Sequence, residues 1–422
     1  MLTRSLALSC VLAMGLASAL AQAAKPLHIK NAKIEAGRGR IIESGDILIV
    51  GGKIEAVGTV ANPPADAETI DASGLVVYPG FFDGYSTRGL KLPDWATSLA
   101  RDSRTVAPPT MDADNKKGFR PELRASDCLD LGSTVASWHA VGVTQACLAP
   151  SSGAFRGQST LVSIAPNGKE FLVNSFAQVV AFSTGTGAGY PDSLMGMISY
   201  IRQSFADATR LSQTTAPDEK SPWLPLVSVV KGTTPLMFVA DSERDISRAL
   251  ILCSEFGCAP IVTMARDAYL KTEMLQRSKA KLIVSVNIGN EPSKTPAQGA
   301  DATPAPVLEE RWANWKKRSE NLLAIAKSNI PFAFSSEGDL DGFLTNVRRI
   351  IKLGLDRTAA LDALTIGAAK LFGVESSLGT VEPGKTANLV LMSGDFADEK
   401  SVAKFVIVGG TKFSLEKSGG SQ

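Results

Sequence analysis

Two hydrogen-bonding side chains stand two residues apart near the start of the chain. Tyr85 and Thr87 end a segment, VVYPGFFDGYST, that begins with an apolar run at Val76. Alternate residues of a strand point to the same side, so we expect the phenol and the hydroxyl to face one site together. They can donate hydrogen bonds to a ligand there, or fill the site as packing residues. Neither offers the lone pair of a neutral imidazole, because a phenol has a pKa of about 10.

Histidine, a common ligand of catalytic zinc, is nearly absent. The whole chain contains only His28 and His139. His139 follows Trp138 in an amphipathic stretch, and we expect both histidines to have packing roles. A catalytic zinc site usually takes three protein ligands and a water. We therefore predict no metal site and no resident cofactor. A catalytic metal lowers the pKa of its bound water to about 7, and without a metal this nucleophile is not formed.

One glutamate that follows an apolar run could act in catalysis. Glu337 follows the apolar run IPFAFSS. A glutamate can act as a general base if burial raises its pKa. Arg266, which follows the run APIVTM and comes two residues after Met264, is one cation that could pair with Glu337, and Arg88 is another. An ion pair or a ligand contact is the alternative role for this glutamate.

The composition is that of an ordinary globular protein. Of the 422 residues, 44% are hydrophobic and 20% are charged, and the formal net charge is +2. This charge gives no electrostatic reason to expect binding to nucleic acid. Residues 1–23 read as a signal peptide, with Arg4 before an apolar run and small residues at the expected cleavage site. We expect a periplasmic or secreted protein with no membrane span in its mature form, because the run is shorter than about 20 residues.

Four cysteines remain after the signal segment, namely Cys128, Cys147, Cys253 and Cys258. An oxidising compartment permits disulfides, and Cys253 and Cys258 are the closest pair in the sequence. Free buried thiols are an equally acceptable outcome in a protein of this size. Zinc binding by these residues is not expected, because no C-x-x-C is present.

The pattern of apolar residues divides the chain into two kinds of region. Residues 25–78 and 374–415 contain short strands separated by glycine and proline, and we expect them to pair into one composite β-sandwich. Residues 79–373 alternate apolar strand-like runs with amphipathic helices, which is typical of parallel βα units. The sequence thus predicts an α/β protein with a small β-rich domain made from its two ends.

The segment around Tyr85 resembles the first barrel strand of the amidohydrolase superfamily, P-G-F-[IF]-D-x-H-x-H. The tail AALDALTIGAAKLFGVESSLGTVEPGKTANLVLMSGD also resembles that superfamily. PELRASD and GVTQACLAPSSGAFRGQSTLV look like a metal-dependent branch related to imidazolonepropionase-like and dipeptidase-like enzymes. The resemblance implies a (β/α)8 TIM-like barrel beside the terminal sandwich, with any site at the C-terminal ends of the barrel strands.

The resemblance also assigns positions to a site. The family would bind zinc or another divalent metal through histidines, where this chain has other residues, and it places Glu337 at the position of a catalytic aspartate. We expect a ligand pocket instead of a metal centre, formed by Tyr85, Thr87, Val239, Met264 and Arg266.

Two functions remain open. The first is a pseudoenzyme that binds an amide- or peptide-like ligand, or an active amidohydrolase paralogue. The second is a hydrolase acting on non-peptide or dipeptide carbon–nitrogen bonds without the usual metal centre, with Glu337 as base and Tyr85 or Arg266 polarising the carbonyl. The resemblance also implies assembly as a homo-oligomer or hetero-oligomer.

Overall fold

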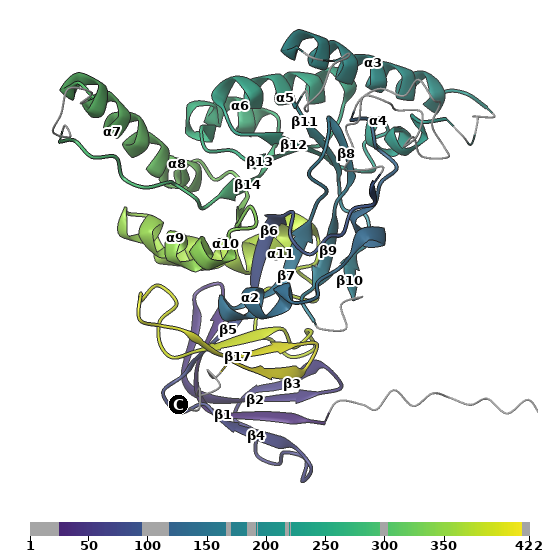
Figure 1. The fold of residues 1–422 in the computed structure, drawn as a ribbon. Helices are drawn as coiled ribbons and strands as arrows, with labels where there is room; N and C mark the ends of the chain where they lie inside the picture. The colour runs from purple at the N-terminus through teal and green to yellow at the C-terminus, as the bar shows by residue number, and fades with distance from the viewer. Residues whose placement is uncertain are drawn as a thin grey trace, which may run out of the picture.

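The structure is a computed structural model that describes residues 25–94, 118–165, 170–183, 191, 193–215, 219, 221–295 and 303–415. The predicted signal peptide lies outside these residues. Figure 1 shows a sheet-rich part below and a part that combines strands with helices above it. The chain is thus an α/β protein, as its sequence predicts.

An eight-stranded sheet is built from both ends of the described chain. β5 pairs antiparallel with β16, so that Val77 lies opposite Leu391, and this pairing joins the N-terminal and C-terminal strands. The Gly51-Gly52 pair, with φ of 56° and 79°, forms the hairpin turn between β2 and β3. The strands are β1 (Leu27–Gly37), β2 (Arg40–Val50), β3 (Lys53–Gly58), β4 (Glu68–Asp71), β5 (Val76–Pro79), β16 (Leu389–Met392), β17 (Ala403–Val408) and β18 (Thr411–Ser414).

The upper part contains two sheets. The order of one is β15-β14-β13-β12-β11-β8, with β11 to β15 parallel, and that of the other is β10-β9-β7-β6, with β6 and β7 parallel. The strands are β6 (Phe81–Ser86), β7 (Val143–Leu148), β8 (Phe155–Gln158), β9 (Thr160–Ser163), β10 (Phe171–Val173), β11 (Gln178–Ala181), β12 (Leu236–Ala240), β13 (Pro260–Met264), β14 (Lys281–Ser285) and β15 (Phe332–Ser335).

The two upper sheets meet at β6 and β15. The Ser335 hydroxyl donates a hydrogen bond to the Tyr85 carbonyl at 2.8 Å, which holds these strands together. Within the described residues, however, no backbone ladder joins β6 to β15, and the antiparallel strands β8 and β9 stand between β7 and β11. The closed eight-stranded barrel therefore stays a prediction.

Helices follow most of the parallel strands. They are α2 (Thr134–Ala140), α3 (Leu194–Ser212), α4 (Val227–Val230), α5 (Glu243–Phe256), α6 (Thr272–Arg277), α7 (Ala305–Ser319), α8 (Asn321–Lys327), α9 (Leu340–Lys352), α10 (Arg357–Leu364) and α11 (Ile366–Phe372), with short 3-10 turns η1 (Ala125–Cys128), η2 (Leu224–Leu226) and η3 (Ala268–Leu270). α7 stands out at the upper left of Figure 1. No described helix has the length and hydropathy of a bilayer-crossing segment.

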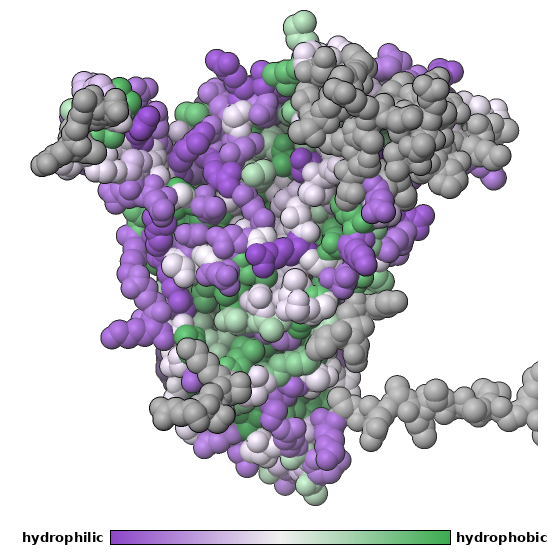
Figure 2. All heavy atoms as spheres, viewed as in Figure 1, coloured by the Kyte–Doolittle hydropathy of each residue, from purple (hydrophilic) through white to green (hydrophobic). Residues whose placement is uncertain are grey.

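Successive side chains of the parallel strands point to opposite faces and so belong to two different hydrophobic clusters. Met237, Ile261 and Ile283 belong to an inner cluster that also contains Phe82, whereas Leu236 and Phe238 belong to the larger cluster that includes buried helix residues. Hydrophilic residues cover much of the upper part in Figure 2, and hydrophobic residues show mainly in the band where that part meets the eight-stranded sheet.

The cysteines Cys128, Cys147, Cys253 and Cys258 are all buried and all free thiols. Cys253 and Cys258 remain unbonded although the Cys258 amide donates to the Cys253 carbonyl at 2.9 Å. Of the two outcomes that the sequence left open, the structure shows the free thiols.

Candidate functional site

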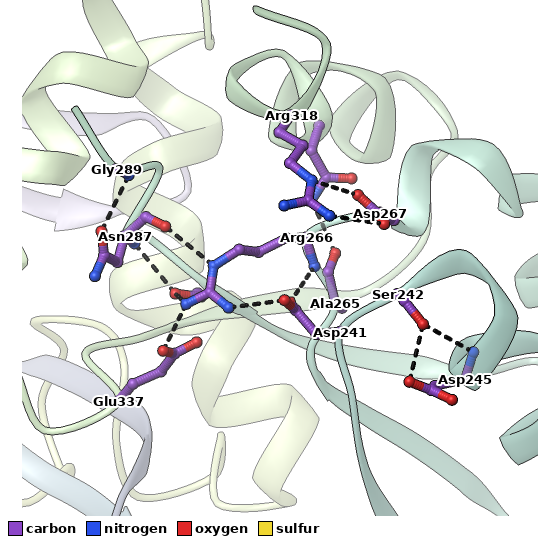
Figure 3. Close-up of polar contacts among 12 residues, drawn as sticks. Asp241, Ser242, Asp245, Ala265, Arg266, Asp267, Asn287, Gly289, Arg318 and Glu337 are labelled. Carbon is purple, nitrogen blue, oxygen red and sulfur yellow. Dashed lines mark hydrogen bonds and ion pairs between the residues drawn. The ribbon is translucent and has the colours of Figure 1, made fainter. Parts of the chain in front are cut away.

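An arginine joins the C-terminal ends of four neighbouring parallel strands (Figure 3). The Arg266 guanidinium, just after β13, lies 2.6 Å from Glu337 Oε2 after β15 and 3.0 Å from Asp241 Oδ2 after β12. It also donates to the Ser285 hydroxyl of β14 and to the Asn287 carbonyl, each at 3.1 Å. One cation therefore holds two carboxylates at the strand ends, where α/β proteins bind ligands.

A sharp turn places this arginine. Met264 and Ala265 both have left-handed backbones, with φ of 72° and 49°. Such φ values cost free energy in residues other than glycine and persist only where the surroundings hold them. Here the Arg266 amide donates to Asp241 Oδ1 at 3.1 Å, and the Ala265 carbonyl accepts from the Asn321 side chain at 2.9 Å. The turn redirects the chain, so the alternation of β13 does not carry on to Arg266.

Asp241 is fixed by the start of the next helix. Ser242, which follows it, caps α5: its hydroxyl accepts a hydrogen bond from the Asp245 amide at 3.2 Å and donates one to the Asp245 carboxylate at 2.9 Å. The Asp267 amide in turn donates to the Asp241 carbonyl at 3.1 Å. Asp241 thus has little freedom to turn away from the guanidinium.

Glu337 is held in an equally constrained position. Its φ is 53°, and its amide donates to the Ser335 hydroxyl at 3.0 Å. The side chain is 18% exposed. Glu337 Oε2 is taken by Arg266, whereas Oε1 is buried and accepts no hydrogen bond within the part of the chain that the structure describes. This oxygen is an unused acceptor beside the guanidinium.

A second carboxylate, Asp83 of β6, supports the turn that carries Glu337. It is fully buried and accepts hydrogen bonds from the Ser336 amide at 2.9 Å, the Ser336 hydroxyl at 2.5 Å and the Trp138 indole at 3.3 Å. Burial raises the pKa of Asp83 to about 6, although the three donors oppose the shift. Asp83 therefore acts on the site through Ser336 rather than by contact with it.

Apart from Arg266, the predicted pocket residues do not line the cavity beside Arg266 that is described next. Tyr85 is only 4% exposed and lies in the inner hydrophobic cluster, against which Val239 packs. The Tyr85 hydroxyl accepts a hydrogen bond from Arg156 at 3.3 Å, and burial raises the pKa of the phenol. Thr87 is half-buried near Gly338, and Met264 lies in the strained turn. Tyr85 and Val239 are placed as packing residues.

A cavity of about 790 Å³ opens beside Arg266. Its volume lies within the range of small-molecule sites. One wall is formed by the strand-end segments, including Asp241, Arg266 and Asn287, and the other by one face of α7. Asp267 and Arg318 form an ion pair at the cavity wall, with N–O distances of 2.9 and 3.2 Å. Of the six predicted site residues, only Arg266 lines this cavity.

The donor set does not fit a divalent metal. The two carboxylates nearest one another at the strand ends, Asp241 and Glu337, are already bridged by a guanidinium. Tyr85 and Val239 lie in an apolar cluster. Across the described residues, no group of three or more His, Cys, Asp or Glu side chains is arranged to hold a metal ion. The positively charged Arg266 occupies the place between carboxylates that a cation would need.

Sequence reasoning missed several members of the site. Asp241, Ser285 and Asn287 each stand at or directly after the end of an apolar strand run, a signal that could have found them. Arg311 and Trp315 come from α7, which follows a long connection, and no local pattern in the sequence places that helix against the strand ends.

Comparison with known proteins finds similarity to amidohydrolases. The amidohydrolase family model matches residues 312–412. The dihydroorotase of Geotalea daltonii is 42% identical over 57 residues, which are 14% of this chain and 13% of that protein. The deacetylase Atu3266 of Agrobacterium fabrum is 45% identical over 60 residues, 14% of this chain and 15% of that protein. The chain therefore matches only a small share of these curated relatives.

Solved structures extend the similarity to nearly the whole chain. An amidohydrolase from Thermotoga maritima MSB8 has a TM-score of 0.72 and 23% identity, covering 92% of this chain and 100% of that one. A Xaa-Pro dipeptidase with bound methionine in its active site has a TM-score of 0.56 and 16% identity over 92% of this chain and 100% of that one. At these identities the likeness concerns the fold. With the family match, it confirms the resemblance to the amidohydrolase superfamily.

Proposed function

We propose that this protein is a binding member of the amidohydrolase superfamily, in which an arginine–carboxylate cluster replaces the metal centre. Its ligand is amide- or peptide-like and occupies the cavity beside Arg266. The observation that carries the proposal is the Arg266 guanidinium held between Asp241 and Glu337 at the strand ends.

The guanidinium is a poor substitute for a catalytic metal. Its Nε and both of its Nη atoms have partners in the protein, namely Asn287, Asp241, Ser285 and Glu337. A guanidinium cannot be deprotonated in a protein and does not activate a water. These contacts use four of its five N–H groups, so one N–H on Nη1 is left with which it could polarise a substrate carbonyl. The cluster is therefore suited to holding the shape of a binding site.

The alternative is a hydrolase that uses Glu337 as a base. The unused Oε1 atom of Glu337 favours this reading, because it leaves an acceptor for a proton. Two observations do not favour it: neither Glu337 nor Tyr85 lines the cavity, and the Tyr85 hydroxyl faces Arg156 from within the inner cluster. Binding without turnover is thus the better-supported function.

Thermal denaturation in the presence of amide-bearing compounds tests the proposal. We expect at least one compound to raise the melting temperature, with no release of its acid or amine product on prolonged incubation. Wild type and Glu337→Gln should then be compared for any hydrolysis. Hydrolysis that is lost in Glu337→Gln would favour the hydrolase instead. If no compound shifts the melting temperature and no partner co-purifies with the protein, neither ligand binding nor association with a paralogue is its function.

Association with an active paralogue remains part of the proposal, as does export to the periplasm or beyond. Both are supported by the sequence, through the family resemblance and through residues 1–23. The closed barrel is likewise proposed from the resemblance, with β6 and β15 as the strands that would complete it. Co-purification from the native host and N-terminal sequencing of the mature protein test the first two.

A further inference from the structure

The charges around the cavity are unevenly distributed. At the strand ends, Asp241 and Arg266 line the cavity as an ion pair, and the second carboxylate that contacts Arg266, that of Glu337, does not line it. On the wall formed by α7, Arg318 is matched by Asp267. Arg311 also lines the cavity, and within the described residues it forms no ion pair or hydrogen bond. The strand-end side therefore offers the side-chain oxygen atoms of Asp241, Ser285 and Asn287, and the α7 side carries an uncompensated cation.

The periodicity of α7 explains why Arg311 faces the cavity. Arg311, Asn314, Trp315 and Arg318 all line it, and their spacing of three, four and seven residues places them on one face of the helix. Lys317 is exposed on the same helix and does not line the cavity. Arg311 therefore faces the cavity, whereas Lys317 of the same helix lies outside it.

Trp315 supplies an apolar surface on the same wall. Its indole N–H donates to the Gly289 carbonyl at 3.5 Å, across the cavity rim from α7 to the segment after β14. A tryptophan ring offers a large contact area to a planar or apolar group. Arg311 lies one helical turn before it, so a ligand can meet the ring and the guanidinium together.

We infer that Arg311 is a specificity-determining residue that selects ligands with a carboxylate at one end. The ligand's carboxylate faces Arg311, its apolar body contacts Trp315, and its amide N–H points to the acceptors at the strand ends. A guanidinium suits this task because its planar N–H groups match a carboxylate. The inference rests on the proposed function, because the cavity must be the ligand site. It adds that the carboxylate end of the ligand lies at Arg311 and the amide lies at the strand ends.

Isothermal titration with N-acetyl-L-phenylalanine and N-acetyl-L-phenylalaninamide tests the inference. These probes share the amide and the ring and differ only in carboxylate against carboxamide. We expect the acid to bind wild type about 10-fold more tightly than the amide. Arg311→Gln should weaken binding of the acid to about the affinity of the amide and so abolish this preference. Lys317→Gln, which removes a positive charge from the same helix outside the cavity, is the matched control and should keep the preference.

Each other outcome has a separate meaning. Equal binding of acid and amide to wild type, or a preference that survives Arg311→Gln, overturns the role of Arg311. Equal loss of preference in Lys317→Gln would show that only the overall charge of α7 matters, and would overturn it as well. If neither probe binds while another amide raises the melting temperature, this inference fails and the proposed function stands. Unchanged melting temperatures of the two variants will show that both fold.

Discussion

Arg266 Nη2 lies 2.6 Å from Glu337 Oε2, although 71 positions separate the two residues in the sequence. They meet because each follows a strand of one parallel sheet, with β14 between β13 and β15. Residues at the C-terminal ends of such strands share one edge of the sheet. This ion pair, extended to Asp241, is the centre of the candidate site.

Removing the Arg266 guanidinium should lower the free energy of unfolding, because two carboxylates would then lie close together without a cation. In Arg266→Met, Asp241 and Glu337 would face each other without a cation. We expect the free energy of unfolding at pH 7 to fall by about 2 kcal/mol, less than for a fully buried pair because these side chains retain some exposure. Urea denaturation followed by circular dichroism gives this quantity.

The double variant Arg266→Met/Glu337→Gln provides the control. Since the second change removes one of the stranded charges, we expect a coupling free energy of about 1 kcal/mol or more between the two positions. A coupling close to zero would mean that the ion pair contributes nothing to the folded state.

Asp83 should give the protein a distinct pH dependence. Its pKa in the folded state is raised to about 6, above the ordinary value of 3.8, so the folded protein keeps a proton that the unfolded chain has lost. The stability contributed at this position is therefore largest below pH 4 and falls by about 3 kcal/mol as the pH rises through 6. Asp83→Asn has no such titration. The advantage of wild type over Asp83→Asn, measured by urea denaturation from pH 4 to pH 7, should decline over that window.

Ser336→Ala separates the contributions of burial and hydrogen bonding to the pKa of Asp83. The Ser336 hydroxyl donates to Asp83 at 2.5 Å and favours the ionised carboxylate. Its removal should raise the pKa of Asp83 further and move the pH window upward. A wild-type advantage that does not change with pH would contradict the raised pKa.

The cysteines should be unreactive in the folded protein. Cys147 is fully buried, and burial raises the pKa of Cys147 and Cys258 to about 12. Since the thiolate is the reactive form, Ellman's reagent should label the native protein very slowly. In urea without reductant, Ellman's reagent should count four free thiols per chain of the mature protein. Rapid native labelling would contradict their burial, and a lower count in urea would show a disulfide.

Much of the fold follows from local patterns in the sequence. The Gly51-Gly52 turn and the apolar runs of β12 to β15 are readable because turn chemistry and strand periodicity are local. Glu337 and Arg266 were named through the family resemblance, which places Glu337 at the position of a catalytic aspartate and Arg266 two residues after the position of a lost histidine.

The rest depends on contacts that no local pattern contains. For Tyr85 and Thr87 the sequence left a ligand contact and a packing role open. Tyr85 is covered by the inner cluster, and Thr87 lies beyond the end of β6, where alternation no longer governs direction. The wall formed by α7 depends on how a helix packs after a long connection. Met264 and Ala265 take left-handed backbones that their residue types do not suggest.

The metal content of the purified mature protein tests the central claim most directly. The protein should be dialysed against a trace of zinc and then analysed by plasma mass spectrometry. Because Arg266 already occupies the space between Asp241 and Glu337, we predict far less than one metal ion per chain. One tightly held zinc per chain would contradict this account, and would show that oxygen or sulfur ligands have built a metal centre.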